Sequence, residues 1–224
     1  MTRVIAHRGA SGRELENTLA AFRAAVELGA DGVELDVHVT SDSRLVVHHD
    51  DVLAGKLIRH ATLDELRAQP LGNGELVPTL DDVLEELGDA VDVFIEVKEL
   101  PAEHDGTLLS VLDSGPAYER YRVHSFDHRI VRRLRDARPS LPCGVLSASY
   151  PLDPIAQVRD AMATSLWQEQ SLIERDLVEL AHNKSIEVCA WTVNDDERMR
   201  ALVELGVDAI CTNYPDVARK VCRR

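Results

Sequence analysis

The sequence has little of what binding to membranes or nucleic acids requires. Aromatic residues make up only 4% of the 224 residues, and no uncharged apolar run approaches the roughly 20 residues that cross a bilayer. Basic residues are also scarce, since 25 Lys and Arg stand against 39 Asp and Glu for a net charge of -14. Nucleic acids and anionic lipids are bound through basic patches. We therefore expect small molecules as partners, without nucleic-acid binding or stable membrane association; the oligomeric state stays open.

Cysteine is scarce as well. The four cysteines show no Cys-x-x-Cys spacing, which argues against a redox or metal motif and favours reduced thiols packed in a core: Cys143, Cys189, Cys211 and Cys222. The chain reaches His7 and Arg8 after three apolar residues, so the start lacks the hydrophobic stretch of a secretory signal. These features predict a cytoplasmic protein.

Short apolar runs alternate with amphipathic helical patterns along the chain, which is typical of a parallel sheet with crossover helices. Eight runs predict strands, at residues 4–7, 32–37, 91–98, 122–126, 143–146, 164–167, 186–193 and 209–212. Helical spacing is seen between them, for example at residues 16–28, 80–87, 128–138, 174–183 and 195–205. We predict an α/β protein, a single-domain (β/α)₈ barrel over residues 1–224, with a short excursion of no clean period at about 52–78.

Several of these strands end in polar side chains, and in a barrel such ends share one rim, where active sites lie. Glu34 and Asp36 are two residues apart on a strand, as are Glu96 and Lys98, so each pair leaves the same strand face. Any one carboxylate could be solvated or paired with Arg. Three that converge repel unless a cation lies among them, and all-oxygen ligation favours Mg²⁺ or Ca²⁺ over zinc. The set predicts a divalent cation held by Glu34, Asp36 and Glu96, with Lys98 facing a phosphate oxygen.

Two histidines stand beside groups suited to anions. His7 precedes Arg8, whose planar guanidinium can grip a phosphate, and His49 precedes Asp50. A lone histidine at a strand end is more often a hydrogen-bonded core group. A pair, however, can divide the general acid and general base roles at neutral pH. We predict that His7 and His49 transfer the protons, with the two roles not assigned.

Eight short motifs in order resemble those of the glycerophosphodiester phosphodiesterases and cover nearly the whole chain. They are His7-Arg8-Gly9, Glu16-Asn17-Thr18, Glu34-Leu35-Asp36-Val37, His49-Asp50, Ile95-Glu96-Val97-Lys98, Ser125-Phe126, Trp191-Thr192-Val193-Asn194 and Thr212-Asn213-Tyr214-Pro215. Each string alone is common, but eight in order are specific. The resemblance implies a (β/α)₈ barrel, a cation at Glu34, Asp36 and Glu96, catalytic His7 and His49, phosphate-binding Arg8 and Lys98, and Trp191 in the substrate pocket.

Two departures from the family pattern bear on the substrate. Asn213 stands where many members have Asp, and the excursion after His49 is short, with residues 59–62 as the nearest remnant of an Arg-Thr-Thr string. The predicted reaction is metal-dependent hydrolysis of a glycerophosphodiester to an alcohol and glycerol 3-phosphate. Two alternatives stay open, a lysophospholipase D-like activity on a lipid phosphodiester and a non-catalytic barrel that binds phosphodiesters.

Overall fold

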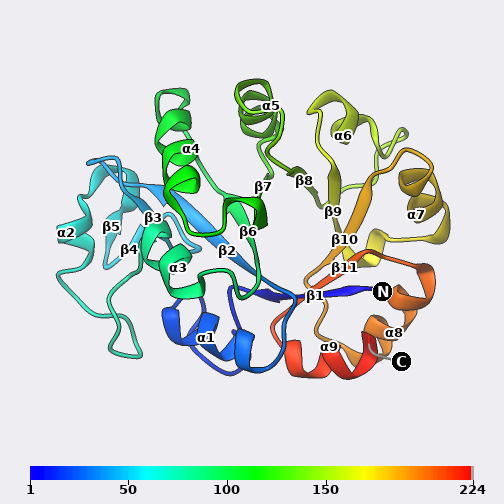
Figure 1. Cartoon of the computed structure of the whole chain (residues 1–224), viewed down its shortest axis with the longest axis horizontal. Helices are drawn as coiled ribbons and strands as arrows, with labels where there is room; N and C mark the ends of the chain where they lie inside the picture. The colour runs from blue at the N-terminus through cyan, green and yellow to red at the C-terminus, as the bar shows by residue number, and fades with distance from the viewer. Residues whose placement is uncertain (223–224) are drawn as a thin grey trace.

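Eight parallel strands close into a barrel in the computed structural model, which describes residues 1–222 (Figure 1). The strands are β1 (Arg3–His7), β2 (Gly32–Val39), β6 (Asp92–Val97), β7 (Tyr121–Ser125), β8 (Cys143–Ser147), β9 (Ser165–Glu169), β10 (Glu187–Trp191) and β11 (Ala209–Thr212). Strand β1 pairs with both β2 and β11, which joins the two ends of the sheet. The predicted (β/α)₈ barrel is confirmed, with each strand near its expected residues.

A helix follows each barrel strand, and together the helices form an outer ring (Figure 1). They are α1 (Leu19–Glu27), α3 (Leu80–Leu87), α4 (Asp105–Ser114), α5 (His128–Ala137), α6 (Ala156–Asp160), α7 (Arg175–His182), α8 (Asp196–Leu205) and α9 (Pro215–Cys222). Helix α1 begins later than predicted because the Thr18 side chain accepts a hydrogen bond from the Ala21 amide and caps the helix there. Within residues 1–222, no helix combines the length and apolar character needed to cross a membrane.

Apolar side chains fill two layers, one between strands and helices and one inside the barrel. The inner layer consists of Ile5, Phe94, Leu146, Trp167, Cys189, Ala209 and Cys211. All four cysteines are free and buried, as predicted. Gly144 makes room for the largest inner side chain, because a Cβ at this position would lie 2.8 Å from Cδ1 of Trp167. The inner layer closes the barrel below its C-terminal rim.

The whole segment between β2 and α3, which is longer than the predicted excursion at about 52–78 and is called the excursion from here on, forms a small subdomain on one side of the barrel. It contains β3 (Leu45–Val47), β4 (Val52–Leu53), β5 (Lys56–Leu57), η1 (Ile58–His60) and α2 (Leu63–Leu66). Strand β3 runs antiparallel to β2 and was not predicted, since three residues are too few to show a period. A capping box between Thr62 and Glu65 starts α2, and a separate apolar cluster around Ile58 and Leu66 supports the segment.

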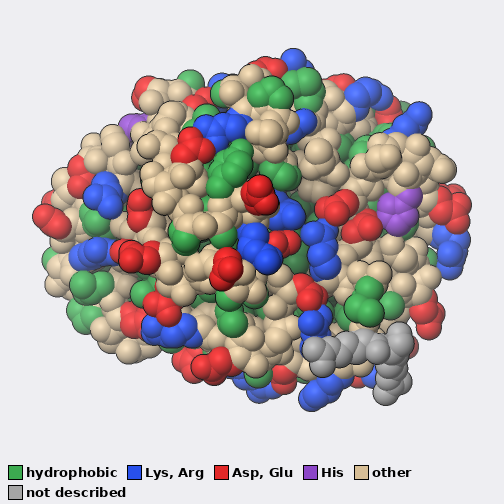
Figure 2. All heavy atoms as spheres, in the orientation of Figure 1, with side chains coloured by type: hydrophobic (Ala, Val, Ile, Leu, Met, Phe, Trp, Pro, Cys, Tyr) green, Lys and Arg blue, Asp and Glu red, His purple; other side chains and the backbone are tan. Residues whose placement is uncertain are grey.

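Charged residues at the N-terminal ends of the strands form a network of ion pairs. Asp92 lies 3.4 Å from both Arg120 and Arg122 and 4.0 Å from Arg3, and Arg3 in turn pairs with Glu187 at 2.8 Å. On the face of the molecule drawn in Figure 2, acidic and basic side chains are interleaved rather than gathered by sign. This face therefore offers no broad basic patch.

Candidate active site

A sharp turn after β1 shapes one side of the C-terminal rim. Arg8 and Gly9 have φ values of 54° and 79°, and a Cβ on Gly9 would lie 2.6 Å from the backbone of Ala21. Only glycine fits there, because both the φ value and the space exclude a side chain. The turn directs the Arg8 amide to Glu34 Oε2 at 3.1 Å and its guanidinium Nε to Asp36 Oδ2, also at 3.1 Å.

The register of the parallel strands brings the predicted site residues together. His7 lies opposite Glu34, and Asp36 lies opposite Glu96. Glu96 in turn lies opposite His124 on β7. A small cavity at this level is lined by His7, Glu34, Glu96, His124, Leu146, Trp167, Trp191 and Cys211. The rim therefore gathers side chains from strands that are far apart in sequence.

The carboxylates of Glu34 and Glu96 suit a cation. Their exposed fractions are only 2% and 7%, and burial raises the pKa of both, with the neighbouring Asp36 charge raising each further. One ligand atom each from Glu34, Glu96 and His124 lies within 4.8 Å of the other two. The cavity that they line measures about 20 Å³, room for one ion or water but not for a substrate. A divalent cation bound there would offset the repulsion of the two buried carboxylates.

Asp36 is already surrounded by positive and donor groups. Lys98 Nζ lies 2.9 Å from Asp36 Oδ1 and 2.5 Å from Glu96 Oε1, and Asn17 Nδ2 donates to Asp36 Oδ2 at 2.8 Å. Burial alone would raise the pKa of Asp36, but Lys98 and Arg8 lower it below its ordinary value. Asp36 thus stays ionised and forms ion pairs with Lys98 and Arg8, the two side chains that were predicted to bind phosphate.

His7 is partly buried, and its ring is neutral. Its Nδ1 lies 2.8 Å from Asn213 Oδ1, so Nδ1–H donates to the amide oxygen and Nε2 carries the free electron pair. Burial, followed by the charge of Arg8, lowers the pKa of His7 to about 4. The side-chain oxygen of Asn213 therefore fixes the ring, and a carboxylate oxygen at this position would accept the same hydrogen bond.

His49 lies on the same rim but in a more open setting. The amide of His48 donates to the Asp36 carbonyl at 3.0 Å, and the ring of His38 contacts the His49 carbonyl at 3.1 Å. The half-exposed His49 ring donates from Nδ1 to Asp50 Oδ1 at 2.7 Å. The excursion thus carries His49 to the edge of the site, while the central cavity is lined by His7 but not by His49.

Sequence reasoning missed His124, and it gave no role to Glu16 or Asn17. The His124 ring stacks on Trp167 with centroids 4.1 Å apart and planes 8° apart, and its Nε2 lies 3.8 Å from Glu34 Oε1. Burial lowers the pKa of His124 to about 3, so the ring is neutral. The available signal was the spacing of Arg122 and His124, two polar residues on the same face of a predicted strand.

Trp191 lines the small cavity and packs against a second aromatic residue, Phe126. Trp191, predicted to bind substrate, is partly buried, and its Nε1 donates to the Trp167 carbonyl at 2.9 Å. The exposed ring of Phe126 packs edge-on against Trp191, with 5.4 Å between centroids. These rings form an apolar wall beside the charged groups.

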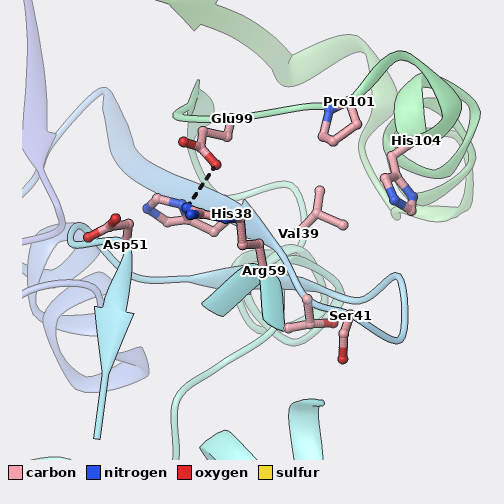
Figure 3. A pocket seen from close by; sticks show the side chains of 9 residues that line it. His38, Val39, Ser41, Asp51, Arg59, Glu99, Pro101 and His104 are labelled. Carbon is pink, nitrogen blue, oxygen red and sulfur yellow. Dashed lines mark ion pairs between the residues drawn. The ribbon is translucent and has the colours of Figure 1, made fainter. Parts of the chain in front are cut away.

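A second, larger pocket of about 270 Å³ lies beside the rim (Figure 3). It is lined by His38, Val39, Thr40, Ser41, Asp51, Arg59, Glu99, Pro101 and His104. Arg59 from the excursion faces Glu99 across 3.9 Å, and Glu99 directly follows Lys98 in the chain. With two carboxylates against one guanidinium, the walls of the pocket are polar and carry an excess negative charge.

Known proteins share this fold along its whole length. The model of the Glycerophosphoryl diester phosphodiesterase family matches residues 7–217. A glycerophosphodiester phosphodiesterase of Caldanaerobacter subterraneus subsp. tengcongensis is 34% identical over 239 residues, which cover 100% of this chain and 98% of that protein. The crystal structure of a glycerophosphodiester phosphodiesterase from Parabacteroides distasonis has a TM-score of 0.91 at 27% identity, covering 99% of this chain and 97% of that chain. A phosphodiesterase of Oleispira antarctica, in complex with the product sn-glycerol-3-phosphate, has a TM-score of 0.92 at 25% identity, with 100% and 98% covered.

The chain belongs to the glycerophosphoryl diester phosphodiesterase family, as the order of its motifs predicted. It is an enzyme, a phosphoric diester hydrolase. The match begins at His7 and so includes every residue predicted for the site.

Proposed function

We propose that this enzyme hydrolyses glycerophosphodiesters to an alcohol and glycerol 3-phosphate, with a divalent cation at the C-terminal rim. The observation that carries the proposal is the convergence of Glu34 and Glu96 on one cavity, next to Asp36 with its two bound cationic side chains. The carboxylates Glu34, Asp36 and Glu96 would hold the cation. That ion would supply charge neutralisation at the phosphate.

Arg8 and Lys98 bind the non-bridging oxygens of the phosphate. Both are held by Asp36, so they are oriented before substrate arrives and need little reorganisation. Glu16 accepts two hydrogen bonds from Arg8 Nη1, at 2.9 and 3.0 Å, and fixes the outer end of the guanidinium. A planar guanidinium in a fixed plane favours two parallel contacts to phosphate.

His7 and His49 divide the proton transfers. His7 is neutral with Nε2 free, so it accepts the proton of the attacking water at that atom. Asp50 accepts a hydrogen bond from Nδ1 of His49 and fixes the orientation of the ring, and His49 donates a proton from Nε2 to the departing alkoxide. One such group supplies about 10²- to 10⁴-fold in rate, so both histidines are needed beside the bound phosphate.

The larger pocket beside the rim, called the side pocket below, receives the polar alcohol of the substrate; its lining residue Glu99 directly follows Lys98 in the chain. Its size suits a small headgroup, and its excess negative charge from Asp51 and Glu99 favours a cationic one. The preferred substrates are therefore glycerophosphodiesters of amino alcohols.

Product analysis tests the proposed reaction. Incubation with glycerophosphocholine and a divalent ion should release choline and glycerol 3-phosphate in equal amounts. Release of phosphocholine and glycerol would show that the opposite ester bond is cleaved. If no phosphodiester is turned over by the folded protein, the proposal fails in favour of a non-catalytic barrel.

A second candidate substrate is a lysophospholipid, because apolar side chains gather on loops at the same rim. Leu15, Phe126, Tyr150 and Leu152 are exposed, and all four lie in loops that follow barrel strands. If these residues contact an acyl chain, lysophosphatidylcholine is cleaved at least as well as glycerophosphocholine, and serine at positions 126 and 152 lowers only the former rate. Equal loss on both substrates, or none on the lipid, excludes acyl-chain contact at these residues, and a failure to cleave lysophosphatidylcholine excludes the lipid activity.

A further inference from the structure

We propose that His124 is a ligand of the catalytic cation, so that the site combines oxygen and nitrogen donors and prefers a first-row transition ion to Mg²⁺ or Ca²⁺. The inference rests on the proposed metal dependence, and it changes the expected ion. Carboxylates alone predict a hard cation, whereas the structure adds an imidazole to the group formed by Glu34 and Glu96.

The placement of His124 fits a ligand. It is the direct neighbour of Glu96 in the strand ladder, and its Nε2 lies 3.8 Å from Glu34 Oε1. Donor atoms bound at about 2.0–2.2 Å to one ion lie roughly 3 to 4.4 Å apart, close to the spacing of this group. The cavity bordered by the three side chains is the one with room for a single ion.

The Nδ1 atom of His124 makes no hydrogen bond with the surrounding described residues. The ring is 1% exposed. Stacking on Trp167 holds the plane of the ring, and Gly144 provides the space for Trp167. The ring is thus oriented by packing, with Nε2 toward Glu34.

His124 adds to the three carboxylates proposed to hold the cation; among the described residues it, and not Asp36, completes the group whose ligand atoms lie within 4.8 Å of one another. The Asp36 carboxylate is engaged by Lys98, Arg8 and Asn17. Imidazole nitrogen binds first-row transition ions well, whereas Mg²⁺ and Ca²⁺ select oxygen. His124 therefore shifts the selectivity of the site without adding charge.

Electron paramagnetic resonance of the full chain loaded with Mn²⁺ tests the ligand directly. Electron spin echo modulation should show a directly bound ¹⁴N, and the pattern should change when the histidines are labelled with ¹⁵N. The signal should disappear in His124→Gln and persist in His7→Gln, which alters the other histidine of the same cavity. Manganese bound without nitrogen coupling overturns the proposal, as does a coupling that His7→Gln removes and His124→Gln leaves.

Calorimetry of the same proteins tests the selectivity. His124→Gln should weaken Mn²⁺ binding by about tenfold or more and Mg²⁺ binding by less than about threefold, since the Gln oxygen can still ligate Mg²⁺. Equal weakening of both ions contradicts a selective nitrogen ligand. If His124→Gln does not fold, the labelled wild type and His7→Gln decide the question. Hydrolysis without nitrogen coupling overturns this inference alone, whereas nitrogen coupling without hydrolysis overturns only the proposed function.

Discussion

The two ends of the barrel both carry charged side chains on the same strands, but they are built differently. Strand β6 begins with Asp92 and has Glu96 near its end, and β1 runs from Arg3 to His7. At the N-terminal end, Asp92 meets three arginines in a partly solvated network. At the C-terminal end, Glu96 is buried and has a raised pKa.

The difference shows that residues only four positions apart on one strand can have different roles, one in stability and the other in the chemistry of the site. Partly exposed ion pairs are worth little individually, about 0 to 1 kcal/mol, and need no ligand to stay charged. Buried carboxylates with raised pKa values are held in an unfavourable state, which a bound cation would relieve. Matched substitutions at the two ends of one strand therefore test whether only the C-terminal end is catalytic.

The largest effect is expected from the pair on β6. Glu96→Gln should lower kcat about 10⁴-fold, because loss of the cation removes several kcal/mol of charge stabilisation and each 1.4 kcal/mol is tenfold. Asp92→Asn should change kcat by less than about twofold, and the free energy of unfolding by at most about 3 kcal/mol, about 1 for each of its three ion pairs. Initial rates of glycerol 3-phosphate release, at one fixed concentration of divalent ion for all proteins, measure both. Similar losses of kcat in the two variants would contradict the claim that only the C-terminal end of the barrel is catalytic.

Next come the histidines. His7→Ala and His49→Ala should each lower kcat about 10³-fold, within the range of a single proton-transfer group. Arg3→Ala, at the other end of β1, serves as the control and should retain kcat within about twofold. Single-turnover rates, with circular dichroism to verify folding, provide the measurement. A variant that keeps more than a tenth of the wild-type rate removes that histidine from the mechanism.

The pH dependence of stability sharpens the contrast on β1. The pKa of His7 is about 4 in the folded protein against 6.5 for an unperturbed histidine. Between these pH values the unfolded chain binds a proton that folded His7 does not, so this residue's stability contribution is present above pH 6.5 and is lost as pH falls toward 4. Urea unfolding from pH 6.5 to 4 should show a slope smaller by up to about 1.4 kcal/mol per pH unit in His7→Gln than in wild type. Arg3→Gln should retain the wild-type slope. An unchanged slope in His7→Gln would mean that His7 binds a proton in the folded protein as readily as in the unfolded chain.

The smallest effect is expected in the side pocket. Glu99→Gln should raise KM for glycerophosphocholine about threefold relative to glycerophosphoglycerol, because a single partly screened charge contributes less than about 1 kcal/mol. Glu187→Gln, exposed at the N-terminal end of β10, is the matched control and should alter neither value. Equal changes in KM for both substrates would mean that the pocket does not distinguish substrates by the charge of the headgroup.

Strand ends were predictable from the sequence because apolar runs and their polar ends repeat along the chain. That pattern gave the barrel and the rim positions of Glu34, Asp36 and Glu96. The spacing of Arg122 and His124 could have marked His124 as a rim residue, but its position opposite Glu96 was not predictable, since that depends on the register between β6 and β7, which is set by the packing of the closed barrel. Likewise, the engagement of Asp36 by Asn17 depends on a turn with φ of 56° at Asn17 that no periodic pattern signals.

Metal removal tests the central claim most directly. Protein stripped with a chelator and dialysed should hydrolyse glycerophosphocholine at less than about one hundredth of the original rate, since the cation contributes several kcal/mol, and stoichiometric divalent ion should restore it. Full activity in metal-free protein, verified by elemental analysis, would contradict a cation-dependent site at Glu34 and Glu96.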